Sequence, residues 1–296
     1  MTDETTNPTP DAPKTLFDRV GVALPIALTA LATALAGMST GELQQAMYWR
    51  SYAAQDQAKA TSQWTLAGFK RDRALICQVA SAQLRAVGGA GSPIPPGAGA
   101  EATGWLAGGG PPPAKLPEVT DEALAKLLDD LRSRAPEDEL IRQARRVSGE
   151  AVTAAIDAAE KSVEQTDRDW EPTLKAAATL VADAARRPAG AAGTPSGVGE
   201  QAACFELERR RYQIEASLNQ GVSLLYEARI KVSSAQSDRH QRKSKQFFYA
   251  MLAAQVGATV AALALARKKQ SLLWAVAGGT GLVAVVIGAS VYLADL

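Results

Sequence analysis

Two cysteines and one histidine are the side chains best suited to chemistry in this sequence, and their spacing predicts no site. Cys77 and Cys204 lie far apart and form no Cys-x-x-Cys pair. A structural zinc ion usually takes four ligands, so these two cysteines and His240 predict no metal site. His240 belongs to the basic run 239–245 beside an apolar segment. That position favours a residue at the level of lipid headgroups over a general base.

Carboxylates and glycines are plentiful, but they form no catalytic or nucleotide-binding pattern. Asp and Glu alternate with Lys and Arg, as they do on solvated helix faces. The glycines follow no strand and open no helix of the kind that cradles phosphate. No nucleophile is paired with a base, so we predict no catalytic residues, no cofactor and no enzyme activity.

Composition narrows the class of protein further. The chain has 296 residues, 47% of them hydrophobic but only 5% aromatic, and its formal net charge is +1. Much of the apolar content is alanine, which supports helices. Phosphate recognition needs an excess of Lys and Arg on one face, so this balance predicts no nucleic-acid partner.

Two long apolar runs near the carboxy-terminal end of the sequence predict a transmembrane hairpin, 247–266 and 271–294. Residues 247–266 carry no charge, and about twenty helical residues span the roughly 30 Å of a bilayer interior. The alternative is a pair of buried core helices, but such helices usually keep a polar stripe. The turn between the runs would hold Arg267, Lys268 and Lys269 in water.

A third apolar run, 20–38, predicts another span. It contains Pro25, which membrane helices tolerate better than soluble ones do. Its end, 34–37, resembles the small-residue cleavage site of a secretory signal. The long acidic tail before it favours an anchor that is not cleaved.

Small residues in the hairpin predict where its helices pack. Alanine recurs at every fourth position from Ala250 to Ala266, which includes Ala254 and Ala258. Gly281 and Gly288 belong to small-xxx-small pairs of the kind that let membrane helices approach closely. The alternative is that alanine and glycine are simply common in this chain. Gln255 lies near the middle of its run, where we expect its amide to bond another helix.

The rest of the chain divides by composition. We predict a disordered tail at 1–19, a long helix at 41–87, Gly/Pro linkers at 88–117 and 188–199, a helical insertion at 118–187 and a heptad helix at 200–246. Thr120 is the expected cap of the first inserted helix, and Pro172 is expected to break the second. Positions from Cys204 to Ala235 follow steps of three and four. The two long helices would form an antiparallel stalk, with a compact bundle as the alternative.

Both ends of the chain resemble a family of bacterial membrane proteins described only as a domain of unknown function. The resemblance rests on QAKATSQW at 57–64, on Lys70 and on the terminal hairpin; its matching residues are Gln57, Trp64, Lys70 and Gln255. Residues 88–199 look like an insertion relative to that family. The resemblance implies an architecture with an amino-terminal membrane helix, but no activity.

The fold class we predict is all-α, with three transmembrane helices and a long antiparallel helical or coiled-coil extramembrane region. Counting Lys and Arg in the short segments favours an extracytoplasmic middle region of a multi-pass protein in the bacterial inner membrane. In that compartment Cys77 and Cys204 could pair, and the sequence leaves that question open. The expected function is a scaffold that contacts the lipid bilayer, further copies of itself and a protein partner that the sequence does not identify. A channel or transporter component is the alternative, with Gln255, Thr259 and Thr280 as its polar candidates.

Overall fold

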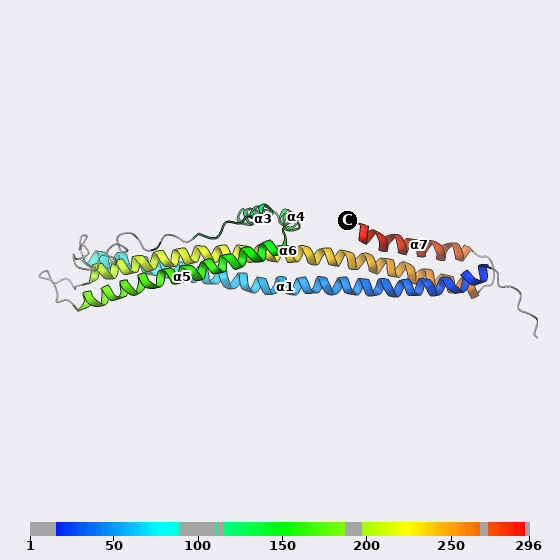
Figure 1. Cartoon of the computed structure of the whole chain (residues 1–296), viewed down its shortest axis with the longest axis horizontal. Helices are drawn as coiled ribbons and strands as arrows, with labels where there is room; N and C mark the ends of the chain where they lie inside the picture. Colours follow the sequence, from blue (N-terminus) through cyan, green and yellow to red (C-terminus); the bar gives the residue numbers. More distant parts are fainter. Residues whose placement is uncertain (1–15, 89–110, 112–114, 187–196, 267–271, 294–296) are drawn as a thin grey trace, which may run out of the picture. The chain divides into compact units, whose positions relative to one another are not determined.

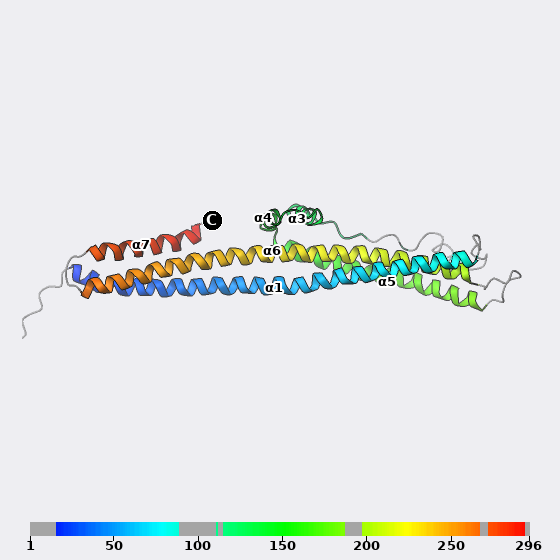
Figure 2. The same cartoon turned by 180° about the vertical axis from the view of Figure 1, so that it is seen from behind.

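The computed structural model describes residues 16–88, 111, 115–186, 197–266 and 272–293, and every regular element within these ranges is an α-helix (Figures 1 and 2). The helices are α1 (Leu16–Gly88), α3 (Glu122–Arg132), α4 (Glu137–Ala144), α5 (Gly149–Ala185), α6 (Val198–Ala266) and α7 (Leu272–Leu293). The predicted all-α fold class is confirmed.

Three of the described helices, α1, α6 and α7, are long and apolar enough to cross a membrane. This agrees with the three predicted spans and makes a multi-pass membrane protein plausible. Helices α1 and α6 each join an apolar stretch to a long polar stretch without a break, and α6 ends at Ala266, the predicted end of the second apolar run. The predicted turn residues Arg267, Lys268 and Lys269 lie outside the described residues.

The chain divides into two compact units. The first comprises residues 1–50 and 236–296, and the second comprises residues 51–235. Helices α1 and α6 contribute to both units, α7 belongs to the first, and α3, α4 and α5 belong to the second.

In the first unit, α1 and α6 are antiparallel and joined by serine hydroxyls. The Ser244 hydroxyl donates to the carbonyl oxygen of Ser39 at 2.8 Å, and Ser237 donates to that of Ala46, also at 2.8 Å. As the residue number on α1 rises from 39 to 46, the number of the contacting residue on α6 falls from 244 to 237, as it does between antiparallel helices. A hydroxyl reaches a neighbouring backbone only when two helices lie close together, as small residues allow.

Helix α7 packs in the same unit through its small residues. A methyl group built on Gly281 would lie 2.7 Å from Leu28 Cδ2, and one built on Gly288 would lie 3.2 Å from Leu35 Cδ2. The partner of these two glycines is therefore α1. Gly257 of α6 supplies the close approach to α7, because its added methyl group would lie 2.6 Å from Thr280 Oγ1.

The alanine ridge predicted on α6 needs correction. Ala254 is buried, but Ala258 is half-buried and the later members of the every-fourth series are exposed. The buried small residues follow alternating steps of four and three: Ala250, Ala254, Gly257, Ala261 and Ala264. A step of four residues rotates about 40° beyond a full turn, so an every-fourth series drifts off any one face. Alternating steps stay on it.

In the second unit, α1, α5 and α6 run side by side (Figures 1 and 2). Trp170 of α5 is almost fully buried and belongs to a cluster with Ala177 and Leu207 of α6. A larger cluster joins α3, α4 and the start of α5 to the middle of α6, and it includes Leu124 and Val222. Helix α6 is thus the central helix of this unit.

Two local predictions in this unit were wrong. The cap of α3 is Asp121, not Thr120: Asp121 Oδ1 accepts the backbone N–H of Leu124 at 2.7 Å. Helix α5 runs through Pro172 to Ala185 without ending. Trp170 and Thr173 are buried on either side of the exposed proline, so packing on α6 offsets the lost backbone hydrogen bond.

Candidate functional site

Four charged residues between α1 and α6 in the second unit form the most unusual group in the described chain; we call Asp56, Lys70, Glu215 and Arg229 the polar seam. Asp56 and Arg229 are the more deeply buried pair, with side chains 2% and 9% exposed. Arg229 Nε lies 2.7 Å from Asp56 Oδ2, and Arg229 Nη2 lies 2.5 Å from Asp56 Oδ1. This is the bidentate geometry that suits guanidinium and carboxylate best.

Aromatic rings complete the surroundings of Arg229. Its guanidinium lies 4.9 Å from the ring centroid of Tyr226 and 5.3 Å from that of Tyr52. Burial opposes the charge of Arg229, but the hydrogen bonds that it donates to Asp56, together with the charge of that carboxylate, raise the pKa of the guanidinium. Tyr226 donates to Glu160 Oε1 of α5 at 2.7 Å. Burial, followed by that hydrogen bond, raises the pKa of Tyr226 to about 12, so the hydroxyl remains a donor at neutral pH.

The second half of the polar seam surrounds Glu215, whose side chain is 1% exposed. Its carboxylate is paired with both Lys70 of α1 and Arg211 of α6. Arg211 also lies 3.6 Å from Asp167 of α5. Glu215 therefore has two cationic partners where Asp56 has one, and the network joins three helices.

The order of acid and base along the chain is the same on both helices of the seam, so antiparallel helices place each acid opposite a base. On α1 an acid (Asp56) is followed by a base (Lys70), and on α6 an acid (Glu215) is followed by a base (Arg229). The separation within each helix is two heptads, so both pairs form in the same antiparallel register. Sliding one helix by a heptad separates both pairs and leaves buried charges unpaired, which is strongly unfavourable. Both ion pairs of the seam are thus satisfied together in the register that the structure shows.

A strict seven-residue repeat of small residues on α1 accompanies this seam. Its members are Ala32, Ser39, Ala46, Ala53, Ala60, Ala67, Ala74 and Ser81. All of them are buried except Ser39, which is half-buried. In the second unit the Ser223 hydroxyl of α6 donates to the carbonyl oxygen of Ala60 at 3.0 Å. This repeat was not among the sequence predictions, which considered small residues only in the hairpin, although the period of seven is visible in the sequence.

The residues of the family-like motif fall into different environments. Trp64 Nε1 donates to Glu227 Oε1 of α6 at 2.7 Å, and Lys70 belongs to the polar seam. Gln57 is exposed on α1. Gln255 is exposed on α6 in the first unit, and its expected bond to another helix stays a prediction. The structure brings only Trp64 and Lys70 to the α1–α6 interface.

His240 lies in the first unit, where its Nδ1 is 2.6 Å from Glu42 Oε2 of α1. No group of three or more His, Cys, Asp or Glu side chains in the described ranges could hold a metal ion. The contact of His240 is therefore one more link between α1 and α6.

Both cysteines are free thiols in the second unit. Cys77 Sγ donates to Glu208 Oε2 of α6 at 3.6 Å. Burial, reinforced by the charge of Glu208, raises the pKa of Cys77 from 9.0 to about 11. Burial also raises the pKa of Cys204. Both thiols therefore stay protonated at neutral pH.

The shift at Cys77 predicts slow alkylation that speeds up far into alkaline pH. A thiolate reacts with an alkylating reagent and a thiol does not. The alkylation rate of Cys77 in the folded chain should therefore rise about tenfold per pH unit up to about pH 11, whereas the rate in the unfolded chain should level off near pH 9. The neutral thiol favours folding below pH 9, and this contribution is lost as pH rises from 9 to 11. Mass spectrometry after brief iodoacetamide treatment at several pH values measures both rates. Equal profiles for folded and unfolded chain would contradict the burial.

Comparison with known proteins finds no matching family model, no similar curated protein and no similar solved structure. Functional inference therefore depends on the contacts of the described residues. The charges of the polar seam are directed at one another and not at a cavity, an arrangement that fixes the relation of two helices.

Proposed function

We propose that this chain is a membrane-anchored helical scaffold without catalytic activity. The observation that carries the proposal is the polar seam, in which buried charges of α1 pair with buried charges of α6 in one antiparallel register. Those same two helices contain apolar stretches long enough to cross a membrane. Pairing of this kind suits a protein whose helices must keep a defined relation while they are anchored in lipid.

The proposed partners are the bilayer, further copies of this chain and a protein partner of unknown identity. Exposed apolar side chains on α1 of the second unit support association through helices; they are Leu66, Phe69, Leu75, Ile76 and Val79. A contiguous exposed apolar patch can mark an interaction surface, whereas scattered apolar residues do not.

We place the protein in the bacterial inner membrane, with residues between the first two spans outside the cytoplasm. Lys14 and Arg19, together with the hairpin turn 267–269, are the cations of the short segments and would lie inside. Four cations at the start of the second apolar run oppose this assignment: Arg239, Arg242, Lys243 and Lys245.

A channel or transporter component is the competing function, and hydroxyl contacts argue against it. Thr259 donates to the carbonyl oxygen of Gln255 at 3.0 Å, and Thr280 donates to that of Ala277 at 3.0 Å. Thr29 donates to the carbonyl oxygen of Pro25 at 2.8 Å. The hydroxyl groups of these threonines are therefore already bonded to the backbone of their own helices. The exposed amide of Gln255 is the observation that favours a channel.

Reconstitution separates the two functions. Carbonate extraction should leave the protein with the membrane pellet, because α1, α6 and α7 are long enough to span it. Liposomes that contain the purified chain should then show the ion conductance of empty liposomes. Conductance that falls on Gln255→Leu, with Gln57→Leu as the control outside the apolar stretches, would replace the scaffold by a channel. Release of the protein into the supernatant by carbonate would contradict membrane anchoring.

A further inference from the structure

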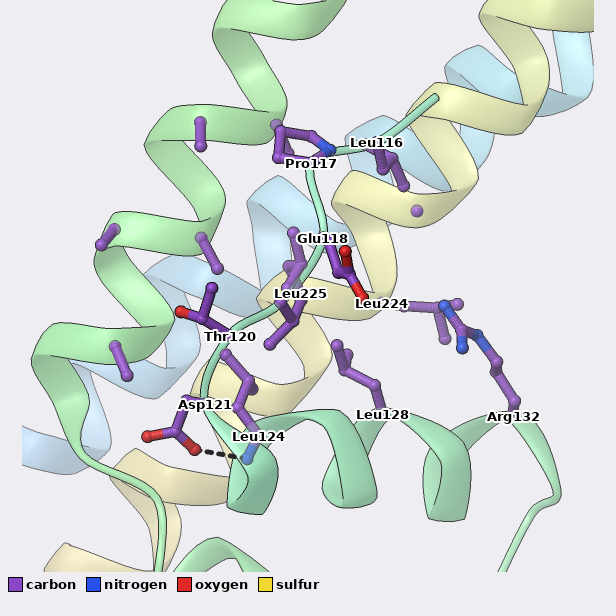
Figure 3. Close-up of a pocket in the computed structure, with 17 residues that line it drawn as sticks. Leu116, Pro117, Glu118, Thr120, Asp121, Leu124, Leu128, Arg132, Leu224 and Leu225 are labelled. Carbon is purple, nitrogen blue, oxygen red and sulfur yellow. Dashed lines mark hydrogen bonds between the residues drawn. The ribbon is translucent and has the colours of Figure 1, made fainter. Parts of the chain in front are cut away.

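The second unit contains a cavity of about 270 Å³ between α3, α5, α6 and the extended segment 116–121 (Figure 3). Its walls are mostly aliphatic. The larger side chains that line it are Leu116, Val119, Leu124, Leu128, Leu224 and Leu225. Figure 3 shows Leu225 and Leu124 directed into the space beneath the extended segment.

Short side chains on α5 leave this space unfilled. Five alanines form that wall: Ala151, Ala154, Ala155, Ala158 and Ala159. On the opposite wall, a methyl group built on Gly221 of α6 would lie 1.9 Å from Leu116 Cδ1. The absence of a side chain at Gly221 therefore lets Leu116 pack against α6, so the extended segment closes one side of the cavity. An apolar space left empty weakens a fold, because its lining atoms lose van der Waals partners.

The polar groups at the margin indicate a neutral occupant. Asp121 already accepts the N–H of Leu124, and Arg132 lies 3.4 Å from Asp129. Glu118 adds a second carboxylate to the lining, which gives two acidic groups against one guanidinium. An anionic ligand would meet repulsion there, and a cation would lie against aliphatic walls.

We propose that this cavity binds a neutral apolar molecule about the size of two fused rings. A dry cavity of about 150 Å³ lined by aliphatic and aromatic residues accepts benzene. The present volume, 270 Å³, is nearly twice that. Mostly apolar walls with a few polar groups at the margin are the usual design of small-molecule sites.

Indole is the probe, added to the full chain in nanodiscs and followed by methyl NMR. Site-resolved signals are needed because indole also partitions into lipid. The expected result is a saturable shift of the methyl signals of Leu124, Leu128 and Leu225, with a dissociation constant on the order of 1 mM or below. Leu174 and Leu207, which pack in the other cluster of this unit, should not shift.

Ala158→Leu fills the cavity and provides the decisive comparison. It should weaken the saturable shift at least about tenfold, which corresponds to roughly 1.4 kcal/mol. Ala178→Leu is the matched control, because Ala178 is exposed on the same helix and does not line the cavity. It should leave the shift unchanged. No saturable shift in the unsubstituted chain overturns the proposal, and so does a shift that survives Ala158→Leu with both variants folded by circular dichroism.

Discussion

Replacing Arg229 by methionine is expected to destabilise the second unit by about 3–5 kcal/mol, which lowers its melting temperature by roughly 10 °C. Methionine keeps most of the aliphatic volume but leaves the carboxylate of Asp56 buried without a cation. Tyr52 and Tyr226 also lose the guanidinium that lies over their rings. Thermal unfolding of the full chain in detergent, followed by helical circular dichroism, measures the loss.

Two further variants test the reason for this effect. Lys70→Met removes one partner of Glu215 but leaves Arg211 in place, so it should cost clearly less than Arg229→Met. Asp56→Leu combined with Arg229→Met removes both buried charges and should recover most of the stability. A double variant as unstable as the single one would show that packing of the guanidinium, and not the unpaired charge, determines the loss.

Gly281→Leu is expected to separate α7 from α1 in the first unit, at a cost of about 1–3 kcal/mol. The added Cβ alone would lie 2.7 Å from Leu28 Cδ2, and the rest of the leucine side chain has no space on that face. Leu28 is itself 5% exposed, so it has little freedom to move away. Melting of the purified chain in detergent measures the change.

Gly279→Leu is the matched control on the same helix. Nothing lies within 4 Å of a methyl group built on Gly279, and the residue is exposed. Both substitutions raise helix propensity to the same extent, so their difference isolates the packing. Equal melting temperatures for the two variants would mean that Gly281 is not at a close contact.

The apolar runs predicted the helices that could span a membrane, because about twenty consecutive uncharged residues are typical of a transmembrane helix. Local rules were weaker where packing overrode them. Pro172 lies inside α5 because Trp170 and Thr173 are buried against neighbours. The cap was expected at Thr120, but it is Asp121, the next residue, whose carboxylate accepts the N–H of Leu124.

The polar seam could not be predicted by a search for hydrophobic periodicity. On α1 the buried face alternates small residues with polar ones, such as Ala53, Asp56 and Ala60, which resemble a solvated surface. Burial of Asp56 depends on Arg229, 173 positions away, and no local pattern connects the two. The repeat of alanine and serine every seven residues was the available signal, since it marks a face on which another helix can lie close.

Disulfide trapping tests the central claim, that α1 and α6 pair in one antiparallel register, most directly. In a chain with Cys77 and Cys204 replaced by alanine, Ser39→Cys with Ser244→Cys should cross-link in native membranes under mild oxidation, because the two hydroxyl oxygens lie 3.2 Å apart. Ala46→Cys with Ser244→Cys is displaced by one heptad, about 10 Å along the helix, and should remain reduced. Mobility on non-reducing gels, with peptide mass spectrometry, reads out both pairs. Cross-linking of the first pair alone is the predicted result; efficient cross-linking of the displaced pair, or of neither, would contradict the register.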